Sequence, residues 1–176
     1  MKGVKKHILC FLTLIMRNYF LPEETYSNIQ DISLDYLMND LKVKGLIFDF
    51  DGTLIKKRKM SPETLEFIKK AKEYGFKISV VSNNIIVSNT ILKSLEISTT
   101  KKFACKPLKK PFLNMAKRMK LSPEHIAVIG NNKISDIFGA NRANMHSIYI
   151  QNNLNNIFIK RKTKNILKQS GIKHID

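Results

Sequence analysis

An α/β fold with a mainly parallel sheet is predicted for this chain of 176 residues by two features of its sequence. Short apolar runs alternate with segments of helical spacing, which is typical of strands joined by helical crossovers. Polar or charged residues follow the ends of these runs, and in parallel sheets ligands bind at the carboxyl ends of the strands. The sequence therefore predicts one α/β domain whose functional site lies along one edge of the sheet.

The individual elements are predicted from local signals. Strands are expected at the apolar runs 45–49, 77–82, 127–130 and 147–150, with a weaker one at 102–104. Ser61-Pro62-Glu63 combines an N-cap residue, a first-turn proline and an early acid, and predicts a helix that ends at Gly75. Ser122-Pro123-Glu124 repeats that start signal. Helical spacing also predicts helices over 85–95, 110–119 and 135–144.

The first apolar run leads directly into Asp49-Phe50-Asp51-Gly52-Thr53. Successive strand side chains alternate faces, so Asp49 and Asp51 are expected on the same side of the strand end. Two carboxylates this close repel each other unless a cation neutralises them or one holds a proton, which suits a Mg²⁺ site with a nucleophile and an acid. The alternative is a plain hairpin turn, for which Asp-Gly between apolar residues is a strong signal.

The ends of the other predicted strands favour the catalytic interpretation over the hairpin. Ser82-Asn83-Asn84 follows the second strand, Lys106 lies near the third, and Gly130-Asn131-Asn132 follows the fourth, with Asp136 just beyond. Because these ends meet at one edge of a parallel sheet, carboxylates, a hydroxyl and a lysine converge there. Chance accounts poorly for four such residues in this order.

In these residues the chain resembles the haloacid dehalogenase superfamily of Mg²⁺-dependent phosphohydrolases. The family motif Asp-x-Asp-Gly-Thr matches residues 49–53, its strand-terminal Ser or Thr matches Ser82, and its lysine matches Lys106. The fourth motif, Gly-Asp-x₄-Asp, matches Gly130 and Asp136, but Asn131 stands where an aspartate is usual. From about Phe20 to Ile150 the chain also resembles the capless YqeG-type subgroup of this superfamily. That subgroup is similar to the mitochondrial phosphatidylglycerophosphate phosphatases. The resemblance rests on Phe20-Leu21-Pro22, Asp31-Ile32, Ser82-Asn83-Asn84, Lys106-Pro107-Leu108 and Asn141-Arg142.

The resemblance implies a Rossmann-like three-layer α/β/α sandwich with a mainly parallel five-stranded sheet and no cap domain. The expected division is an N-terminal helical or interfacial segment (1–40), a catalytic core (41–152) and a basic C-terminal helical tail (153–176). The spacings from Asp51 to Ser82 and from Ser82 to Lys106 leave room for single helices but not for a lid. An open site suits a bulky substrate such as a lipid head group.

The resemblance also implies a role for each matched residue. Asp49 is expected to attack phosphorus and form an aspartyl-phosphate, while Asp51 protonates the leaving oxygen and then accepts a proton from water. Ser82 is expected to bind a phosphoryl oxygen, and Lys106 to neutralise phosphoryl charge. Thr53 and Asn83 are further candidates for substrate binding, although for Asn83 we prefer a helix cap. The expected ligands of Mg²⁺ are Asp49, Asp51 through its carbonyl, Asn131 and Asp136, with Asn131 either a ligand or an orienter of water.

The charge of the chain points to anionic partners. There are 31 Lys and Arg against 14 Asp and Glu, a formal net charge of +17, part of which biased composition explains. Basic residues cluster near the predicted site at 56–59, 101–102 and 109–110, which favours an anionic membrane surface. The two cysteines form no metal-ligand spacing and no disulfide framework, as expected for a reduced, cytoplasmic chain. The apolar run 8–16 is too short to span a membrane and fits an interfacial helix or one packed on the domain.

The resemblance implies a Mg²⁺-dependent phosphatase with phosphatidylglycerophosphate as the expected substrate, and the basic clusters favour peripheral contact with an anionic membrane. A first alternative is a phosphatase of small soluble phosphate esters. A second is a catalytically weakened basic protein that binds RNA or ribosomes, which Asn131 and the net charge support. No nucleic-acid-binding motif accompanies that charge, so nucleic acid is the less expected partner.

Overall fold

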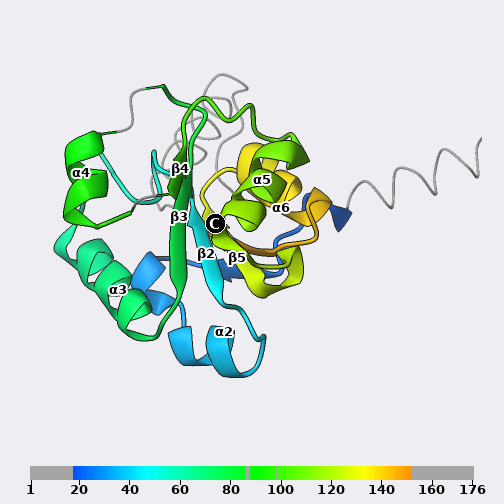
Figure 1. Ribbon diagram of the computed structural model, residues 1–176, viewed down its shortest axis with the longest axis horizontal. Coiled ribbons are helices and arrows are strands. Elements are labelled where there is room, and N and C mark those ends of the chain that lie inside the picture. The colour runs from blue at the N-terminus through cyan, green and yellow to red at the C-terminus, as the bar shows by residue number, and fades with distance from the viewer. Residues whose placement is uncertain (1–17, 86–87, 98, 152–176) are drawn as a thin grey trace, which may run out of the picture.

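The computed structural model describes residues 18–85, 88–97 and 99–151, which form a parallel sheet with helices on both faces (Figure 1). Six strands lie in the order β1-β6-β5-β2-β3-β4, and every neighbouring pair is parallel. Their bounds are β1 Glu24–Tyr26, β2 Gly45–Phe48, β3 Lys77–Val81, β4 Thr99–Lys101, β5 Ile126–Gly130 and β6 His146–Ile150. The predicted α/β fold with a parallel sheet is confirmed.

The sheet has one strand more than the five expected. The additional strand β1 is only three residues long and reads Glu-Thr-Tyr, so it carries no apolar run that a sequence pattern could reveal. It lies at the edge of the sheet and pairs with β6. His146 of β6 binds Glu24 at 2.5 Å and also pairs with Glu23, which adds polar contacts between these strands. Strand β4 lies three residues before the expected run at 102–104.

The α-helices are α2 Leu34–Asn39, α3 Pro62–Glu73, α4 Asn89–Ser94, α5 Lys109–Met119 and α6 Gly139–Arg142. Shorter turns are the 3₁₀ segments η1 Ile29–Asp31 and η2 Pro123–His125, and the π-helical segment η3 Lys133–Phe138. Helices α3, α4 and α5 form at segments predicted to be helical, the segment 135–144 divides between η3 and α6, and α2 is a helix that helical spacing did not predict. Ser61 caps α3 as predicted, its Oγ accepting from the backbone N–H of Thr64 at 3.2 Å. The same signal at Ser122 opens only one 3₁₀ turn, because β5 begins at Ile126, directly after that turn.

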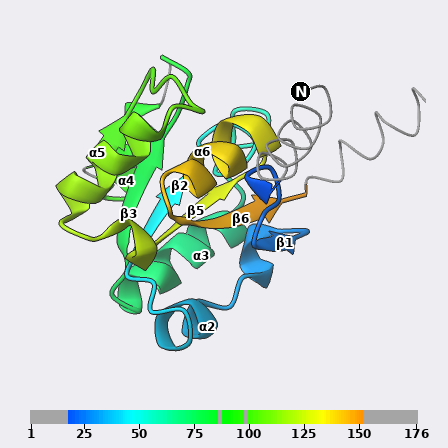
Figure 2. The same cartoon turned by 90° about the vertical axis from the view of Figure 1, so that its right-hand side faces the viewer.

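Three layers result from this arrangement. Helices α3 and α4 lie on one side of the sheet and α5 and α6 on the other (Figures 1 and 2). The buried strand β2 contributes to both cores: Leu46 and Phe48 pack in the core that includes α3, and Ile47 packs in the core that includes α5. A strand buried on both faces has a continuous apolar sequence, as the run 45–48 does.

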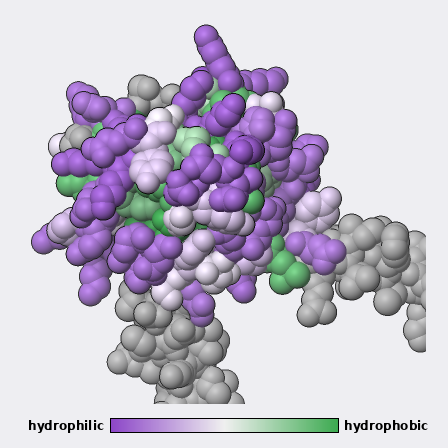
Figure 3. Space-filling view, turned by 90° about the horizontal axis from the view of Figure 1, so that it is seen from below, coloured by the Kyte–Doolittle hydropathy of each residue, from purple (hydrophilic) through white to green (hydrophobic). Residues whose placement is uncertain are grey.

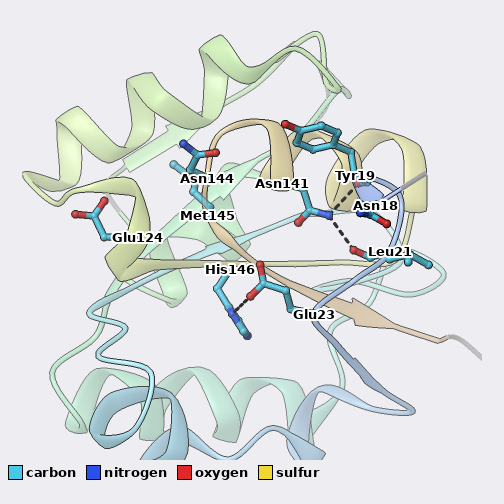
Figure 4. A pocket seen from close by; sticks show the side chains of 9 residues that line it. All are labelled: Asn18, Tyr19, Leu21, Glu23, Glu124, Asn141, Asn144, Met145 and His146. Atoms are coloured by element: carbon cyan, nitrogen blue, oxygen red, sulfur yellow. Dashed lines mark hydrogen bonds and ion pairs between the residues drawn. The ribbon is translucent and has the colours of Figure 1, made fainter. Parts of the chain in front are cut away.

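The chain from residue 18 crosses the outside of α6 before it enters the sheet as β1. Asn141 of α6 donates two hydrogen bonds from its side-chain amide, to the carbonyls of Tyr19 (2.9 Å) and Leu21 (2.8 Å), and both are visible in Figure 4. Phe20 stacks on Phe138 with ring centroids 4.3 Å apart. The likeness noted at Phe20-Leu21-Pro22 and at Asn141-Arg142 therefore concerns two segments that contact each other.

Residues 1–17 and 152–176 lie outside the described part of the chain, so the expected interfacial helix, the basic tail and the domain boundaries remain predictions. Among the residues that the structure describes, no helix is long and apolar enough to cross a membrane. Seen from the end of the sheet at which α2 lies, the surface is mostly hydrophilic, with apolar patches between the charged side chains (Figure 3).

The strand order reverses direction at β2, and this reversal determines where a site can form. From β2 the chain proceeds outward to β3 and β4 on one side, and it returns to β5 and β6 on the other. The loops after β2 and β5 diverge at their carboxyl ends, which opens a crevice where parallel sheets bind ligands. Asp49 begins the loop after β2, and its N–H donates to the carbonyl of Ile129 in β5 at 2.9 Å.

Candidate active site

A lysine between two carboxylates forms the centre of this crevice. Nζ of Lys106 lies 2.6 Å from Oδ1 of Asp49 and 2.6 Å from Oδ1 of Asp136. The side chains of Lys106, Asp49 and Asp136 are 2%, 11% and 1% exposed, so only Asp49 is in part open to solvent. In the sequence Lys106 lies 57 positions after Asp49 and 30 positions before Asp136, and the fold brings the three side chains into one ion-pair cluster.

The backbone around Asp136 is built to hold its carboxylate in place. Asp136 lies in η3, and its Oδ2 accepts from the backbone N–H of Asn132 at 3.0 Å, while Oδ1 also accepts from the hydroxyl of Ser135 at 3.0 Å. A Cβ on Gly130, the last residue of β5, would collide with the Asp136 side chain. Glycine at position 130 therefore lets the carboxylate approach the strand end, and the carboxylate is satisfied by three donors.

Burial and charge shift the pKa values in this cluster. Burial raises the pKa of the Asp49 carboxyl to about 6, since Lys106 lowers it by less and Asp136 raises it further. Burial by itself lowers the pKa of Lys106, but the charges of Asp136 and Asp49 outweigh burial, so that pKa is raised. The cluster therefore sets two carboxyl groups against one ammonium group, and its surroundings disfavour the charged form of Asp49.

Asn131 and Thr53 lie on the other side of Asp49. The hydroxyl of Thr53, which is buried, lies 3.4 Å from Oδ2 of Asp49 and 3.4 Å from Oδ1 of Asn131. Gly52 has a φ of +85°, and a Cβ there would collide with the Asn131 side chain. Glycine fits this left-handed conformation without strain and leaves room for the amide.

The donor set of this cluster fits a hard divalent cation. It contains carboxylate, amide and hydroxyl oxygens, which suit Mg²⁺. In the described ranges of the chain, no three His, Cys, Asp or Glu side chains are grouped closely enough to hold a metal. An Asn oxygen or a backbone carbonyl must therefore complete any cation site here.

Asp51 and Ser82 are linked through Asn84. Asp51 is exposed, and its Oδ2 accepts from the side-chain amide of Asn84 at 3.3 Å. Ser82 is buried, and its Oγ accepts from the backbone N–H of Asn84 at 3.0 Å. Because β2 ends at Phe48, the strand alternation that placed Asp49 and Asp51 together does not extend to Asp51. Both residues nevertheless lie at the predicted edge of the sheet.

Asn83 has a role that the sequence did not reveal. Its Oδ1 accepts from the backbone N–H of Lys106 at 2.7 Å, and its Nδ2 donates to the carbonyl of Lys106 at 3.1 Å. The preferred interpretation of Asn83 as a helix cap is wrong, because α4 begins after Ser88, whose Oγ accepts from the N–H of Ile91. Asn83 instead clamps the backbone that carries the central lysine, a long-range contact that no local pattern indicates.

A cavity of about 450 Å³ beside Asn141 is separate from this cluster (Figure 4). Glu23, Glu124 and His146 are among its lining residues, and none of the predicted site residues lines it. Its members come from the chain before β1, from η2, and from α6 and the turn that leads into β6. It therefore does not compete with the carboxyl edge as the place where the predicted site residues act.

Comparison with known proteins places this arrangement in a family. A model of haloacid dehalogenase-like hydrolases matches residues 56–144, which include Ser82, Lys106 and Asp136 and begin just after Asp49 and Asp51. The chain is also similar to the probable phosphatase YqeG of Bacillus subtilis strain 168. The two sequences are 33% identical over 139 residues, which are 77% of this chain and 80% of that protein.

Solved structures give the same fold. An uncharacterised protein of Listeria monocytogenes serotype 4b is 24% identical, with a TM-score of 0.52 over 62% of this chain and 79% of that one. An uncharacterised protein of Corynebacterium glutamicum ATCC 13032 Kitasato is 17% identical, with a TM-score of 0.55 over 76% of this chain and 99% of that one. At these identities the likeness concerns the fold alone.

Replacing Asn83 by alanine is expected to lower the free energy of unfolding by about 1–3 kcal/mol. Each net hydrogen bond contributes about 0.5–1.5 kcal/mol, and Asn83→Ala removes both bonds to the Lys106 backbone. Urea denaturation measures the change. Asn114→Ala, the same substitution at an exposed position of α5, is the control, with an expected change within about 0.5 kcal/mol. Equal losses in the two variants would contradict the clamp.

Proposed function

The chain belongs to the haloacid dehalogenase-like hydrolases, and from this membership and its site geometry we propose that it is a Mg²⁺-dependent phosphomonoesterase that acts through an aspartyl-phosphate on Asp49. Its proposed substrate is phosphatidylglycerophosphate at a membrane surface. The observation that carries the proposal is the cluster of Asp49, Lys106 and Asp136. In this cluster the buried ammonium group of Lys106 holds the partly exposed carboxylate of Asp49 at the carboxyl edge of the sheet.

The first proposed step transfers the phosphoryl group to the protein. A carboxylate oxygen of Asp49 attacks phosphorus and forms a P–O bond, while the bond from phosphorus to the ester oxygen breaks. Asp51, which is exposed and lies next to Asn84, donates a proton to the departing oxygen. Lys106 lies within 2.6 Å of Asp49 and is placed to balance the charge that spreads over the phosphoryl oxygens.

The second proposed step returns the protein to its starting state. Water attacks phosphorus of the aspartyl-phosphate, Asp51 accepts a proton from this water, and the bond between phosphorus and the Asp49 oxygen breaks. Inorganic phosphate leaves and Asp51 is again protonated. Ser82 lies at the same edge and is proposed to bind a phosphoryl oxygen. Asn83 is proposed to act indirectly, because its side chain holds the backbone of Lys106 in place.

Asp49 and Asn131, whose oxygens both face the Thr53 hydroxyl, are proposed to hold Mg²⁺ with the carbonyl of Asp51. When bound, the cation supplies positive charge that stabilises the phosphoryl oxygens in the transition state. Asp136 has three donors on its carboxylate and is proposed mainly to fix Lys106. Thr53 orients the two oxygens on either side of it and is the candidate for contact with substrate.

The proposed lipid substrate rests on the openness and charge of the site. Between Asp51 and Ser82 the chain forms a short loop, α3 and β3, and between Ser82 and Lys106 the described residues form α4 and β4, which leaves no room for a lid domain. Lys56, Lys57, Arg58 and Lys59 are exposed directly after the first motif. An open, basic edge favours a phosphomonoester at an anionic surface over a small ester that a closed pocket encloses.

The experiment that tests the proposal is phosphate release with and without Mg²⁺ from phosphatidylglycerophosphate micelles and from a panel of soluble phosphomonoesters. Release from the lipid is expected, with a loss of about 10³-fold or more in Asp49→Asn because the nucleophile is removed. Release from soluble esters alone would retain the mechanism and exclude the lipid. No release from any ester would favour the weakened basic binding protein, which the asparagine at position 131 supports.

Replacing Asn131 by aspartate is expected to lower the Mg²⁺ concentration for half-maximal rate by about tenfold, because a charged ligand replaces a neutral one. A Mg²⁺ titration of the hydrolysis rate measures this. Asn132→Asp adds the same charge one residue away, where the side chain caps η3 instead of facing Thr53, and is the matched control. A shift of equal size in both variants would mean that general charge, not coordination at position 131, causes it.

A further inference from the structure

Four large apolar side chains are exposed around the proposed active site, on three segments of the chain. Ile85 follows β3, Phe103 follows β4, Leu108 precedes α5, and Ile134 lies in η3 after β5. Their exposed fractions are 68%, 64%, 55% and 60%. All three segments leave the carboxyl ends of strands, so the apolar side chains surround the edge at which Asp49 and Lys106 lie.

The backbone holds one of these side chains outward at a cost. Phe103 has a φ of +47°, in the left-handed region that bulky residues avoid, and Cys105 two residues later has a φ of +58°. The N–H of Phe103 donates to the carbonyl of Asn84 at 3.3 Å, which brings the loops that carry Phe103 and Ile85 together. A strained loop that exposes an aromatic ring indicates a function for that exposure.

The charge around these apolar residues has one sign. The loops and helix starts that carry them, with the loop after β2, also expose Lys56, Lys57, Arg58, Lys59, Lys101, Lys109, Lys110 and Lys133. The carboxylates in the described parts of these segments belong to the site itself: Asp49, Asp51 and Asp136. Apolar side chains within a basic ring match a surface that offers acyl chains beneath anionic head groups.

We propose that this surface, defined by Ile85, Phe103, Leu108 and Ile134 with the surrounding basic residues, docks on an anionic phospholipid bilayer. The four apolar side chains enter the head-group region while the basic residues contact lipid phosphates. This proposal rests on the proposed function. Docking would bring a lipid phosphomonoester to Asp49 while the lipid stays in the membrane. A second copy of this chain is a poor occupant, because two such basic surfaces repel each other. Nucleic acid matches the charge but not the apolar side chains.

Introduced tryptophans test the docking directly, because the chain contains none. Single variants Phe103→Trp and Ile134→Trp report from the proposed surface. Tyr36→Trp and Tyr74→Trp are matched controls, since these tyrosines are 42% and 50% exposed and lie in α2 and at the end of α3, before β2 and β3 begin. None of the four positions belongs to the catalytic machinery.

With vesicles of equal parts phosphatidylglycerol and phosphatidylcholine, the tryptophan fluorescence of the Phe103→Trp and Ile134→Trp variants is expected to shift to the blue and to be quenched by brominated acyl chains. The controls are expected to stay unshifted, and vesicles of phosphatidylcholine alone to give no shift at either surface. The proposal is overturned if the full chain binds the vesicles while both reporters remain in water, or if it does not bind them.

A second measurement separates docking from catalysis. Combining Ile85→Ser, Phe103→Ser, Leu108→Ser and Ile134→Ser is expected to weaken vesicle binding by at least about tenfold, since apolar area no longer enters the bilayer. Hydrolysis of a soluble phosphomonoester should stay unchanged, and Tyr36→Ser with Tyr74→Ser should alter neither. Unchanged vesicle binding in the fourfold variant would overturn the docking surface. Insertion without hydrolysis of any ester would retain the docking surface and refute the proposed function instead.

Discussion

The ion pairs of Lys106 with Asp49 and Asp136 are the interaction on which the candidate site depends. They join the end of β2, the loop before α5 and the turn after β5, three segments that otherwise diverge at the switch point of the sheet. Removing one partner of a buried pair costs about 3–5 kcal/mol, because the other charge is left without compensation. Neighbouring groups serve this cluster: Gly130 makes room for Asp136, and Asn83 fixes the backbone of Lys106.

The unequal exposure of the two carboxylates separates their roles. Asp136 is sealed and fully hydrogen-bonded, so it anchors the lysine, whereas Asp49 is in part open and burial raises its pKa to about 6. Asp49 is thereby the carboxyl group of the cluster that an incoming cation and phosphoryl group can reach. In the described part of the chain only single helices and strands separate the site residues that follow β2, β3 and β4, and the basic and apolar side chains of this edge are exposed, which connects the chemistry of the cluster to the kind of surface that can carry the substrate.

Local patterns in the sequence predicted much of the fold and the membership of the site. Buried strands such as 45–48 have continuous apolar sequences, and Ser61-Pro62-Glu63 encodes a helix start, so these elements were predictable. Strand β1 was not, because its three residues, Glu-Thr-Tyr, carry no apolar run and its partner β6 is far along the chain. The clamp by Asn83 was missed for a similar reason: its partner is 23 residues away. Ser122 shows the converse, since its start signal is cut short by the strand that follows.

Capture of the phosphoryl group on Asp49 would test the central claim most directly. Asp51→Asn, given a phosphate ester with a good leaving group and Mg²⁺, should still form the aspartyl-phosphate, because such a leaving group needs no proton, but it lacks the base that activates water. After acid quenching, mass spectrometry should find one phosphoryl group on the peptide that contains Asp49, and none when Asp49→Asn is added. An unmodified peptide from a chain that hydrolyses the ester, or phosphate on another residue, would contradict the account.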